Sequence, residues 1–190
     1  MESKIHDDKT FENISYAEKL TRDTEFNNCV FKKCDLNNSE FILCKFIDCV
    51  FEECNLSMIK WDRSTLSSVV FKHCKLLGVN FSLCGDFLFC VRFESSILDY
   101  ASFMRKKMPK TNFIKTSLKE TTFSNAILAG SVFDQCDLSG TVFSATDLSA
   151  VNFSTSFNYI IDPELNNIRK AAFSADGLPG LLDKYDIRIV

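Results

Sequence analysis

The stretch FILCKFIDCVFEECNL, residues Phe41–Leu56, has a cysteine at every fifth position, namely Cys44, Cys49 and Cys54. Five residues rotate a helix by about 140°, and in a flat strand they bring the side chain to the opposite face. Neither a helix nor a single strand therefore keeps these cysteines on one side. The same stretch also has a large apolar residue at every fifth position, two places after each cysteine. A repeat of five residues decides the fold.

Large apolar residues continue at this interval over most of the chain. The first series has twelve members: Phe26, Phe31, Leu36, Phe41, Phe46, Phe51, Leu56, Trp61, Leu66, Phe71, Leu76 and Phe81. After a slip of two residues near Gly85 and Asp86, a second series has fourteen: Leu88, Phe93, Leu98, Phe103, Met108, Phe113, Leu118, Phe123, Leu128, Phe133, Leu138, Phe143, Leu148 and Phe153. A repeated unit of this kind buries its apolar side chain only by stacking on its neighbours.

The five-residue unit predicts a coil that turns once per unit, so that every large residue points inward. In the second series Phe alternates with Leu or Met, which favours an even number of sides. Two sides leave no interior and six leave one too wide to fill, so we expect four. Each coil then has 20 residues, and adjacent coils pair as parallel strands about 4.8 Å apart.

The cysteines are interpreted as small inward residues of this coil. Eight of the nine keep the position two places before the inward residue of a unit, where Ser, Thr, Ala or Val otherwise stands, with Cys84 at the start of the slip, and Cys90 is the exception. Zinc sites favour closely paired cysteines that converge. A disulfide needs Cβ atoms about 3.8 Å apart, whereas stacked cysteines point in parallel. We therefore expect neither a metal site nor disulfides, and no cofactor.

Composition and charge set further limits on function. The N-terminus has no signal peptide and no apolar run reaches the length of a membrane span, which indicates a cytoplasmic protein with reduced thiols. The net charge is only −3. Basic residues prevail in residues 86–120, whereas residues 121–160 contain Asp134, Asp137 and Asp147 and no basic residue.

Three units give the repeat in its clearest form: CDLSG at 136–140, TDLSA at 146–150 and VNFST at 151–155. This pattern resembles the pentapeptide-repeat proteins over about residues 24–155. The resemblance implies an all-β fold, a right-handed quadrilateral parallel β-helix, in agreement with the four sides argued above.

The C-terminal tail extends the resemblance. Its sequence offers Asp162 as a helix N-cap with Pro163 in the first turn, then an amphipathic turn and two alternating isoleucines. It resembles the C-terminal helix and strand with which several family members dimerise. The expected interface consists of Leu178, Leu181, Leu182, Tyr185, Ile187 and Ile189. The predicted domains are an N-terminal cap segment (1–23), the β-helix (24–156) with its slip near 85–87, and this tail (157–190).

Length, repeat and tail together resemble the McbG and Qnr type of small bacterial proteins, which protect DNA gyrase from microcin or quinolones. The resemblance implies a dimer that binds gyrase or topoisomerase IV through a DNA-like surface, with no direct nucleic-acid or membrane binding. DNA carries about one charge per 1.7 Å, so a rod of roughly 31 Å, the height of six and a half coils, would need about 18 negative charges to copy it. A net charge of −3 does not supply them. A scaffold for another protein partner is the alternative.

Candidate partner-binding residues are the charged ones that point outward. We expect an unopposed acidic group of Asp134, Asp137, Asp147, Asp162 and Glu164, in which Asp137 and Asp147 lie on opposite faces. The basic group is Arg105, Lys106, Lys107 and Lys110, and for it we expect either solvated lysines at a bulged corner or a docking patch.

Catalysis is not expected from this sequence. His73 is predicted to point outward without a nucleophile beside it, and His6 to lie in a mobile N-terminal tail. A filled rod also has little concave surface, so we expect a binding protein and not an enzyme.

Overall fold

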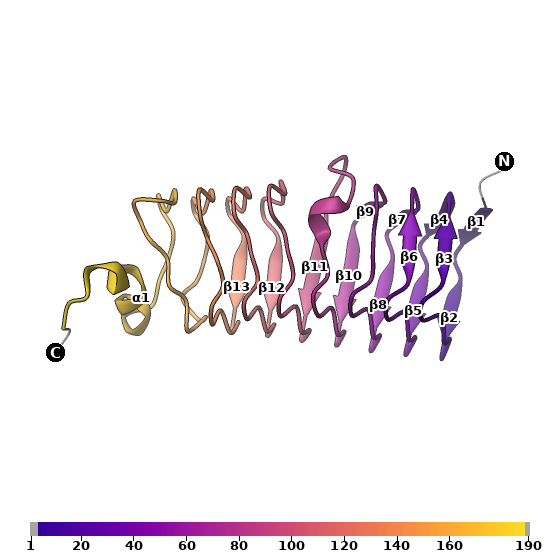
Figure 1. Cartoon of the computed structure of the whole chain (residues 1–190), viewed down its shortest axis with the longest axis horizontal. Helices are drawn as coiled ribbons and strands as arrows, with labels where there is room; N and C mark the ends of the chain where they lie inside the picture. Colours follow the sequence, from indigo (N-terminus) through magenta and orange to yellow (C-terminus); the bar gives the residue numbers. More distant parts are fainter. Residues whose placement is uncertain (1–3, 189–190) are drawn as a thin grey trace.

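The computed structural model describes residues 4–188, which wind into a long rod with the two ends of the chain at opposite ends (Figure 1). Short strands form the walls of the rod. The strands are β1 (Lys4–Asp7), β2 (Thr10–Glu12), β3 (Leu20–Arg22), β4 (Thr24–Asn27), β5 (Val30–Lys32), β6 (Glu40–Ile42), β7 (Lys45–Ile47), β8 (Val50–Glu52), β9 (Thr65–Ser67), β10 (Val69–Lys72), β11 (Val91–Glu94), β12 (Asn112–Ile114) and β13 (Val132–Asp134). The helical turns are η1 (Phe81–Leu83), η2 (Ala175–Gly177), α1 (Pro179–Leu182) and η3 (Asp183–Tyr185).

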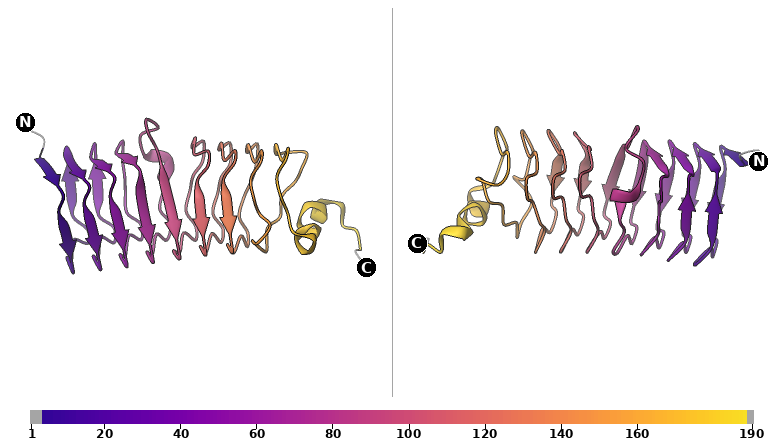
Figure 2. Two further views of the ribbon diagram at one scale, coloured as in Figure 1. Left: turned by 180° about the vertical axis from the view of Figure 1, so that it is seen from behind. Right: turned by 45° about the horizontal axis from the view of Figure 1, so that its top comes forward.

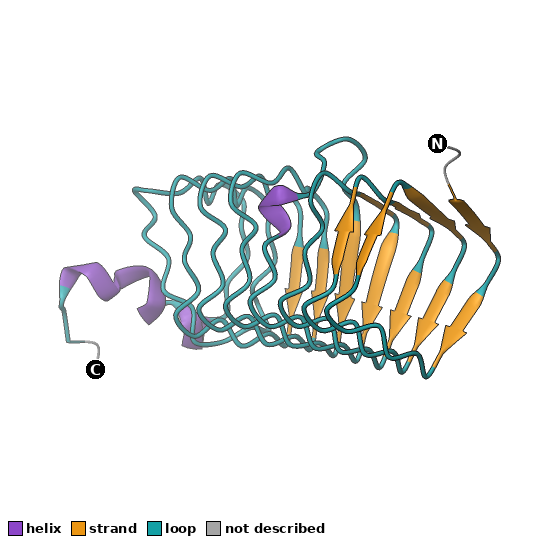
Figure 3. Ribbon diagram, turned by 45° about the vertical axis from the view of Figure 1, so that its right-hand side comes forward, coloured by secondary structure: helices purple, strands orange, loops and turns teal. Residues whose placement is uncertain are grey.

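All paired strands are parallel, and in each coil before the slip a residue pairs with the residue 20 positions later. Phe31 in β5 lies beside Phe51 in β8, and Phe26 in β4 beside Phe46 in β7. Twenty residues contain four units of five, so the coil has four sides. The longest sheet runs β13-β12-β11-β10-β8-β5-β2 along one side of the rod (Figures 2 and 3). The predicted four-sided parallel β-helix is confirmed.

The coil turns at residues in the left-handed backbone region. At most corners the residue two places after the inward one has a positive φ, as at Asn13 (53°), Asn28 (50°) and Asn38 (54°). Asn tolerates this conformation better than most residues, but Leu43 and Met58, both at 56°, adopt it as well. The corner therefore follows from the coil as a whole, and individual residues conform to it.

The core is a set of stacked side-chain columns. On the side formed by the longest sheet, nine phenylalanine rings stack with centroids 4.6–5.4 Å apart: Phe11, Phe31, Phe51, Phe71, Phe93, Phe113, Phe133, Phe153 and Phe173. On the opposite side Phe41 stacks on Trp61 at 5.4 Å. These separations are typical of favourable aromatic pairs. The filled interior confirms the predicted columns.

The small inward residues hydrogen-bond neighbouring coils. The Cys49 thiol donates to the Phe26 carbonyl (3.3 Å), and the Ser64 hydroxyl donates to the Phe41 carbonyl (2.9 Å) while accepting from the Cys44 amide (3.0 Å). Burial raises the pKa of Cys49 to about 12, which keeps the thiol protonated as a donor. Eight of the nine cysteines are buried and Cys90 is exposed, as the repeat predicts.

The coil extends beyond both predicted boundaries. Strand β1 pairs with β4, Lys4 beside Thr24, so residues 4–22 form a first coil rather than a separate segment. His6 belongs to this coil and its ring stacks on Phe26 at 5.1 Å, which corrects the expectation of a mobile tail. At the other end, bridges from Asp147 to Asn167 and from Asn152 to Ala172 continue the pairing past residue 156.

The register slip differs in detail from the prediction. Phe89 fills the core position expected for Leu88 and packs edge-on against Phe81 (6.3 Å between centroids). Leu88 is exposed and has a φ of 58°. The extra residues follow η1 in a loop that rises above the outline of the rod (Figure 1). This loop absorbs the slip, and the larger aromatic ring takes the buried place.

No helix within residues 4–188 is long and apolar enough to cross a membrane.

Candidate functional surfaces

The N-terminal half of the rod carries ladders of opposite charge. Stacking places Lys32 above Glu52 (3.6 Å) on one side. Other axial pairs repeat this arrangement: Lys33–Glu53 at 3.8 Å, Lys45–Glu25 at 3.0 Å, Lys60–Glu40 at 2.5 Å and Lys72–Glu94 at 3.9 Å. Each pair joins residues one coil apart. Exposed pairs contribute little to stability, but they neutralise the surface charge at each step along the rod. The phosphates of a DNA backbone, in contrast, all carry negative charge.

The aspartates of the C-terminal half lie in separate columns. Asp134 is in β13 and accepts from the Thr155 hydroxyl (2.8 Å). Asp137 and Asp147 are two units apart in a four-sided coil, so they lie on opposite sides, as predicted. Asp147 accepts from the Asn167 amide nitrogen (2.9 Å). The structure does not bring the three together into one patch.

The carboxylate of Asp137 is held by several hydrogen bonds and by an ion pair. Burial opposes its ionisation, but hydrogen bonds from Ser139, Asn158 and Lys119 outweigh this effect and lower its pKa to about 2. The Lys119 ammonium lies 3.2 Å from its second carboxylate oxygen. The expectation of an unopposed acidic group is therefore wrong at this position, because a lysine from the preceding coil pairs with it.

Asp162 and Glu164 are not unopposed either. The Lys184 ammonium lies 2.8 Å from Asp162 and 2.7 Å from Glu164. The predicted helix start at Asp162 and Pro163 is also wrong: these residues form a turn, in which Asp162 accepts from the Glu164 amide (2.8 Å). The α-helix of the tail is α1, further along the chain. Lys184 links the tail to the last coil through these two ion pairs. The spacing of the residues in the sequence does not predict this contact.

Three of the four candidate basic residues are exposed, namely Arg105, Lys107 and Lys110. Lys106 is only 1% exposed. Its ammonium donates to the Cys84 carbonyl (2.6 Å) and to the Asp86 carboxylate (2.8 Å), and lies 4.8 Å from the centre of the Phe89 ring. The expectation of a solvated lysine is wrong here. The register slip supplies the carbonyl and the carboxylate that allow a lysine at an inward position.

The loop at the slip projects an aromatic side chain into solvent. Phe87 is 78% exposed and follows Asp86, the residue that Lys106 holds. Most other phenylalanines are buried in the columns. At this loop the register of the large inward residues shifts by two, and Lys106 fixes its base.

His73 and the possible metal ligands are the side chains relevant to catalysis. His73 is an exposed corner residue with a φ of 53°, pointing outward as predicted. Within the part of the chain that the structure describes, no three His, Cys, Asp or Glu side chains converge as metal ligands would.

Comparison with protein families agrees with the repeat. A family model described as "Pentapeptide repeat region" matches residues 8–103, and one described as "Pentapeptide repeats (8 copies)" matches residues 116–154. The chain belongs to the pentapeptide-repeat proteins. A comparison with curated protein sequences gives no significant match.

Two solved pentapeptide-repeat structures are similar over the whole chain. Both are trypsin-treated variants of QnrB1, described as "a plasmid-mediated fluoroquinolone resistance protein". The first has a TM-score of 0.65 at 17% identity and covers 100% of both chains. The second has a TM-score of 0.64 at 18% identity, covering 98% of this chain and 100% of the other. At this identity the likeness establishes the fold of this pentapeptide-repeat protein.

The C-terminal end of this pentapeptide-repeat protein exposes an apolar surface. Of the predicted interface residues, Leu181 packs partly against the core, whereas Leu178, Leu182, Tyr185 and Ile187 are exposed. Ile189 lies outside the described residues. Three further exposed apolar residues come from the last coils: Phe157, Ile160 and Leu165. The predicted terminal strand is absent at Ile187, which has no regular structure.

The tail approaches the last coil closely. The Ile161 amide donates to the Gly180 carbonyl in α1 (2.9 Å). A side chain at Gly180 would collide with the Tyr159 backbone carbonyl, so glycine allows α1 to lie directly on the coil. The tail thereby covers the C-terminal end of the core.

Proposed function

We propose that this protein is a non-enzymatic binding protein of the bacterial cytoplasm that binds a type II topoisomerase, gyrase or topoisomerase IV, and protects it from a toxin or a quinolone. The supporting observation is the likeness to QnrB1 over the full length of both chains, tail included. The likeness is one of fold, so the partner itself is the part to be tested.

The proposed binding unit is a homodimer joined at the C-terminal ends. The exposed apolar side chains of the tail and last coils support this, because an interaction site is expected where such side chains form one patch. Dimerisation would double the length of the rod and place Asp134, Asp137 and Asp147 near its centre.

The paired charges along the rod favour recognition by shape over recognition by charge. A surface whose lysines and glutamates pair along the rod offers shape, hydrogen bonds and local apolar contacts rather than a strong field. We propose that the partner recognises the rod by shape, with the exposed Phe87 loop and the basic residues Arg105, Lys107 and Lys110 as local contacts.

The same ladders favour the second candidate function, a scaffold rod for a protein other than a topoisomerase. The repeat specifies only the core, and a neutralised surface suits many partners. A DNA-supercoiling assay distinguishes the two candidate functions, because only a protein that binds a topoisomerase should change the activity of gyrase.

The test is DNA supercoiling by purified gyrase, with and without ciprofloxacin, at increasing concentrations of this protein. We expect the protein to restore supercoiling in the presence of the drug. A triple variant, Asp134→Asn with Asp137→Asn and Asp147→Asn, tests whether the aspartates contribute. No effect of the folded wild-type protein on gyrase or on topoisomerase IV at micromolar concentration would reject the proposal in favour of the scaffold.

A further inference from the structure

The first coil of the rod has an inward layer unlike the layers that follow. Its four inward residues are His6, Phe11, Tyr16 and Thr21. The Tyr16 hydroxyl and the Thr21 hydroxyl are hydrogen-bonded to each other (2.9 Å). Thr21 begins the column that continues with the large rings of Phe41 and Trp61. The Tyr16 ring stacks on that of Phe41 at 6.4 Å between centroids, so the place above Phe41 is only partly filled.

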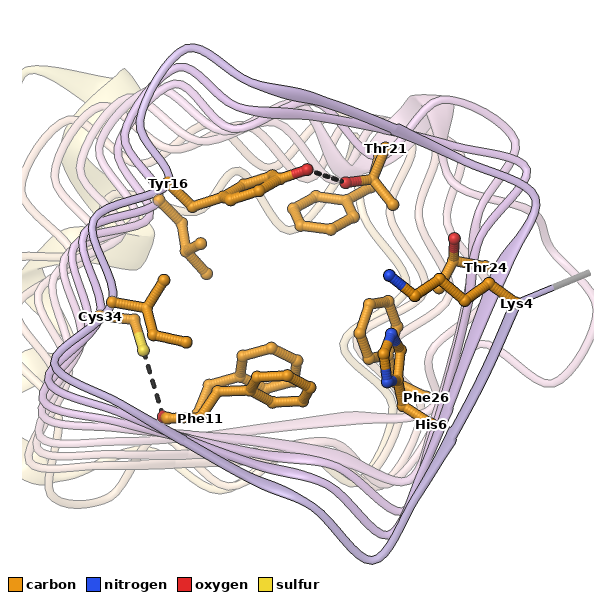
Figure 4. Close-up of a pocket in the computed structure, with 12 residues that line it drawn as sticks. Lys4, His6, Phe11, Tyr16, Thr21, Thr24, Phe26 and Cys34 are labelled. Carbon is orange, nitrogen blue, oxygen red and sulfur yellow. Dashed lines mark hydrogen bonds between the residues drawn. The ribbon is translucent and has the colours of Figure 1, made fainter.

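The unfilled space is a cavity of about 220 Å³ that opens at the N-terminal end of the rod (Figure 4). Its floor consists of the second layer, Phe26, Phe31, Leu36 and Phe41, and its walls include the first layer. The helical tail covers the other end of the core (Figure 1). Within residues 4–188 the N-terminal end therefore has an apolar, mainly aromatic pocket that is open at one side.

Three lysines belong to the coil that forms the mouth of this cavity. Lys4, Lys9 and Lys19 each stand two places before an inward residue, the position that is small and buried in later coils. Lys4 lines the cavity, with its ammonium over the opening (Figure 4). The Lys9 ammonium lies 3.2 Å from Nδ1 of His6, and that of Lys19 lies 5.0 Å from the centre of the Tyr16 ring.

Two carboxylates of the first coil are engaged by side chains of the next coil. Asp7 accepts from the Asn27 side chain (2.8 Å) and Asp8 from the Asn28 side chain (2.6 Å). Burial, followed by the charges of Lys9 and Lys4, lowers the pKa of His6, and the opposing effect of Asp7 is smaller. The three lysines therefore supply positive charge beside the mouth, in a coil that also carries the exposed carboxylates of Glu12 and Glu18.

We propose that the N-terminal cavity binds a small amphiphilic anion, a carboxylate whose apolar body enters the aromatic pocket and whose charged group lies among Lys4, Lys9 and Lys19. An apolar cavity of about 150 Å³ holds a benzene ring, so this one accommodates a body of about nine carbon atoms or fewer. Ligand pockets of this kind are largely apolar, with a few polar groups that fix orientation.

The experiment uses octanoate as the probe, octan-1-ol as its neutral match, and the full-length protein. Binding is followed by calorimetry and by the fluorescence of Trp61, the only tryptophan, which stacks on Phe41 in the cavity floor. We expect saturable binding of one octanoate per chain. The neutral alcohol should bind more weakly.

Two variants separate the apolar and the charged parts of the site. Thr21→Phe completes the column of Phe41 and fills the cavity, so it should weaken octanoate binding by about tenfold or more while the protein melts at or above the wild-type temperature. Lys4→Gln with Lys9→Gln and Lys19→Gln should weaken octanoate binding and leave octan-1-ol binding unchanged. Lys60→Gln, two coils further along the rod from the opening, is the matched control and should bind octanoate as the wild type does.

Three results would overturn the proposal. One is the absence of saturable octanoate binding to the folded wild type in the millimolar range. Another is unchanged binding by folded Thr21→Phe. The third is an end-to-end association of two copies of the chain. If the lysine variant alters this association and octanoate does not, the opening is a contact site for a second copy.

Discussion

Replacing Lys106 by methionine tests the unexpected interior of the register slip. The change keeps the length of the side chain and removes the ammonium that donates to the Cys84 carbonyl and to Asp86. Lys106 is 1% exposed, so its loss leaves a carbonyl without its donor in a buried place.

The magnitude follows from the two contacts. Removing one partner of a buried charged pair costs about 3–5 kcal/mol, but Asp86 is 77% exposed, so its share is reduced by solvent screening. The Cys84 carbonyl loses a charged hydrogen bond worth about 1.5–3 kcal/mol. We expect Lys106→Met to lower the free energy of unfolding by about 2–3 kcal/mol, mostly through this carbonyl.

The assay is urea unfolding followed by circular dichroism and by Trp61 fluorescence. Lys107→Met removes an exposed lysine from the next position and is the matched control, expected to change the free energy by less than about 0.5 kcal/mol. Limited proteolysis should cleave near Phe87 faster in Lys106→Met than in the control, because the base of the loop is released. Equal stability and equal cleavage of the two variants would refute the role assigned to Lys106.

Three further predictions concern the thiols and the corners. In the native protein Cys90 should react with a thiol reagent well before the other eight cysteines, which are buried; rapid reaction of more than one thiol under native conditions would contradict the arrangement of the core. Burial raises the pKa values of Cys49 and Cys84 to about 12 and that of Cys136 to about 11, above the ordinary value near 8.5, so unfolded chains lose these protons first. The contribution of these thiols to the free energy of unfolding should therefore be fully present below about pH 8.5 and should fall as the pH rises toward 11. Cys49→Ser keeps a hydrogen-bond donor and should make this fall less steep. An unchanged slope would count against the buried thiols as the cause of the fall. Leu43 has a φ of 56°, which is unfavourable for a bulky residue. Leu43→Asn should therefore raise the free energy of unfolding, measured by urea titration, by about 0.5–1 kcal/mol. A loss of stability would show that the exposed leucine contributes by packing.

The sequence pattern determines the core because each unit repeats the same inward geometry. The period of five, the columns and the inward cysteines could all be predicted, since two long series of units with the same period leave one consistent arrangement. The first coil was not predicted, because His6 and Thr21 interrupt the apolar series. Counting back by fives from Phe26 also meets Tyr16 and Phe11, and these two aromatic residues were the available signal.

Positions that depend on contacts between coils could not be predicted in the same way. A two-residue insertion can be absorbed at several places, so the choice of Phe89 over Leu88 rests on packing against Phe81. Lys184 pairs with Asp162 from 22 residues away, after a turn that the spacing does not fix. The candidate partner-binding residues stay a prediction for the same reason, because a repeat that specifies its core leaves its surface free.

The most direct test of the proposed function is the affinity of the protein for immobilised gyrase, measured by surface plasmon resonance between about 50 and 200 mM salt. A DNA-like ligand with six to ten charge contacts would lose about 10³–10⁵-fold in affinity over this range. The paired charges of the rod predict micromolar or tighter binding that changes by less than about tenfold. A DNA-like loss of affinity would contradict recognition by shape, and the absence of binding at either salt concentration would contradict gyrase as the partner.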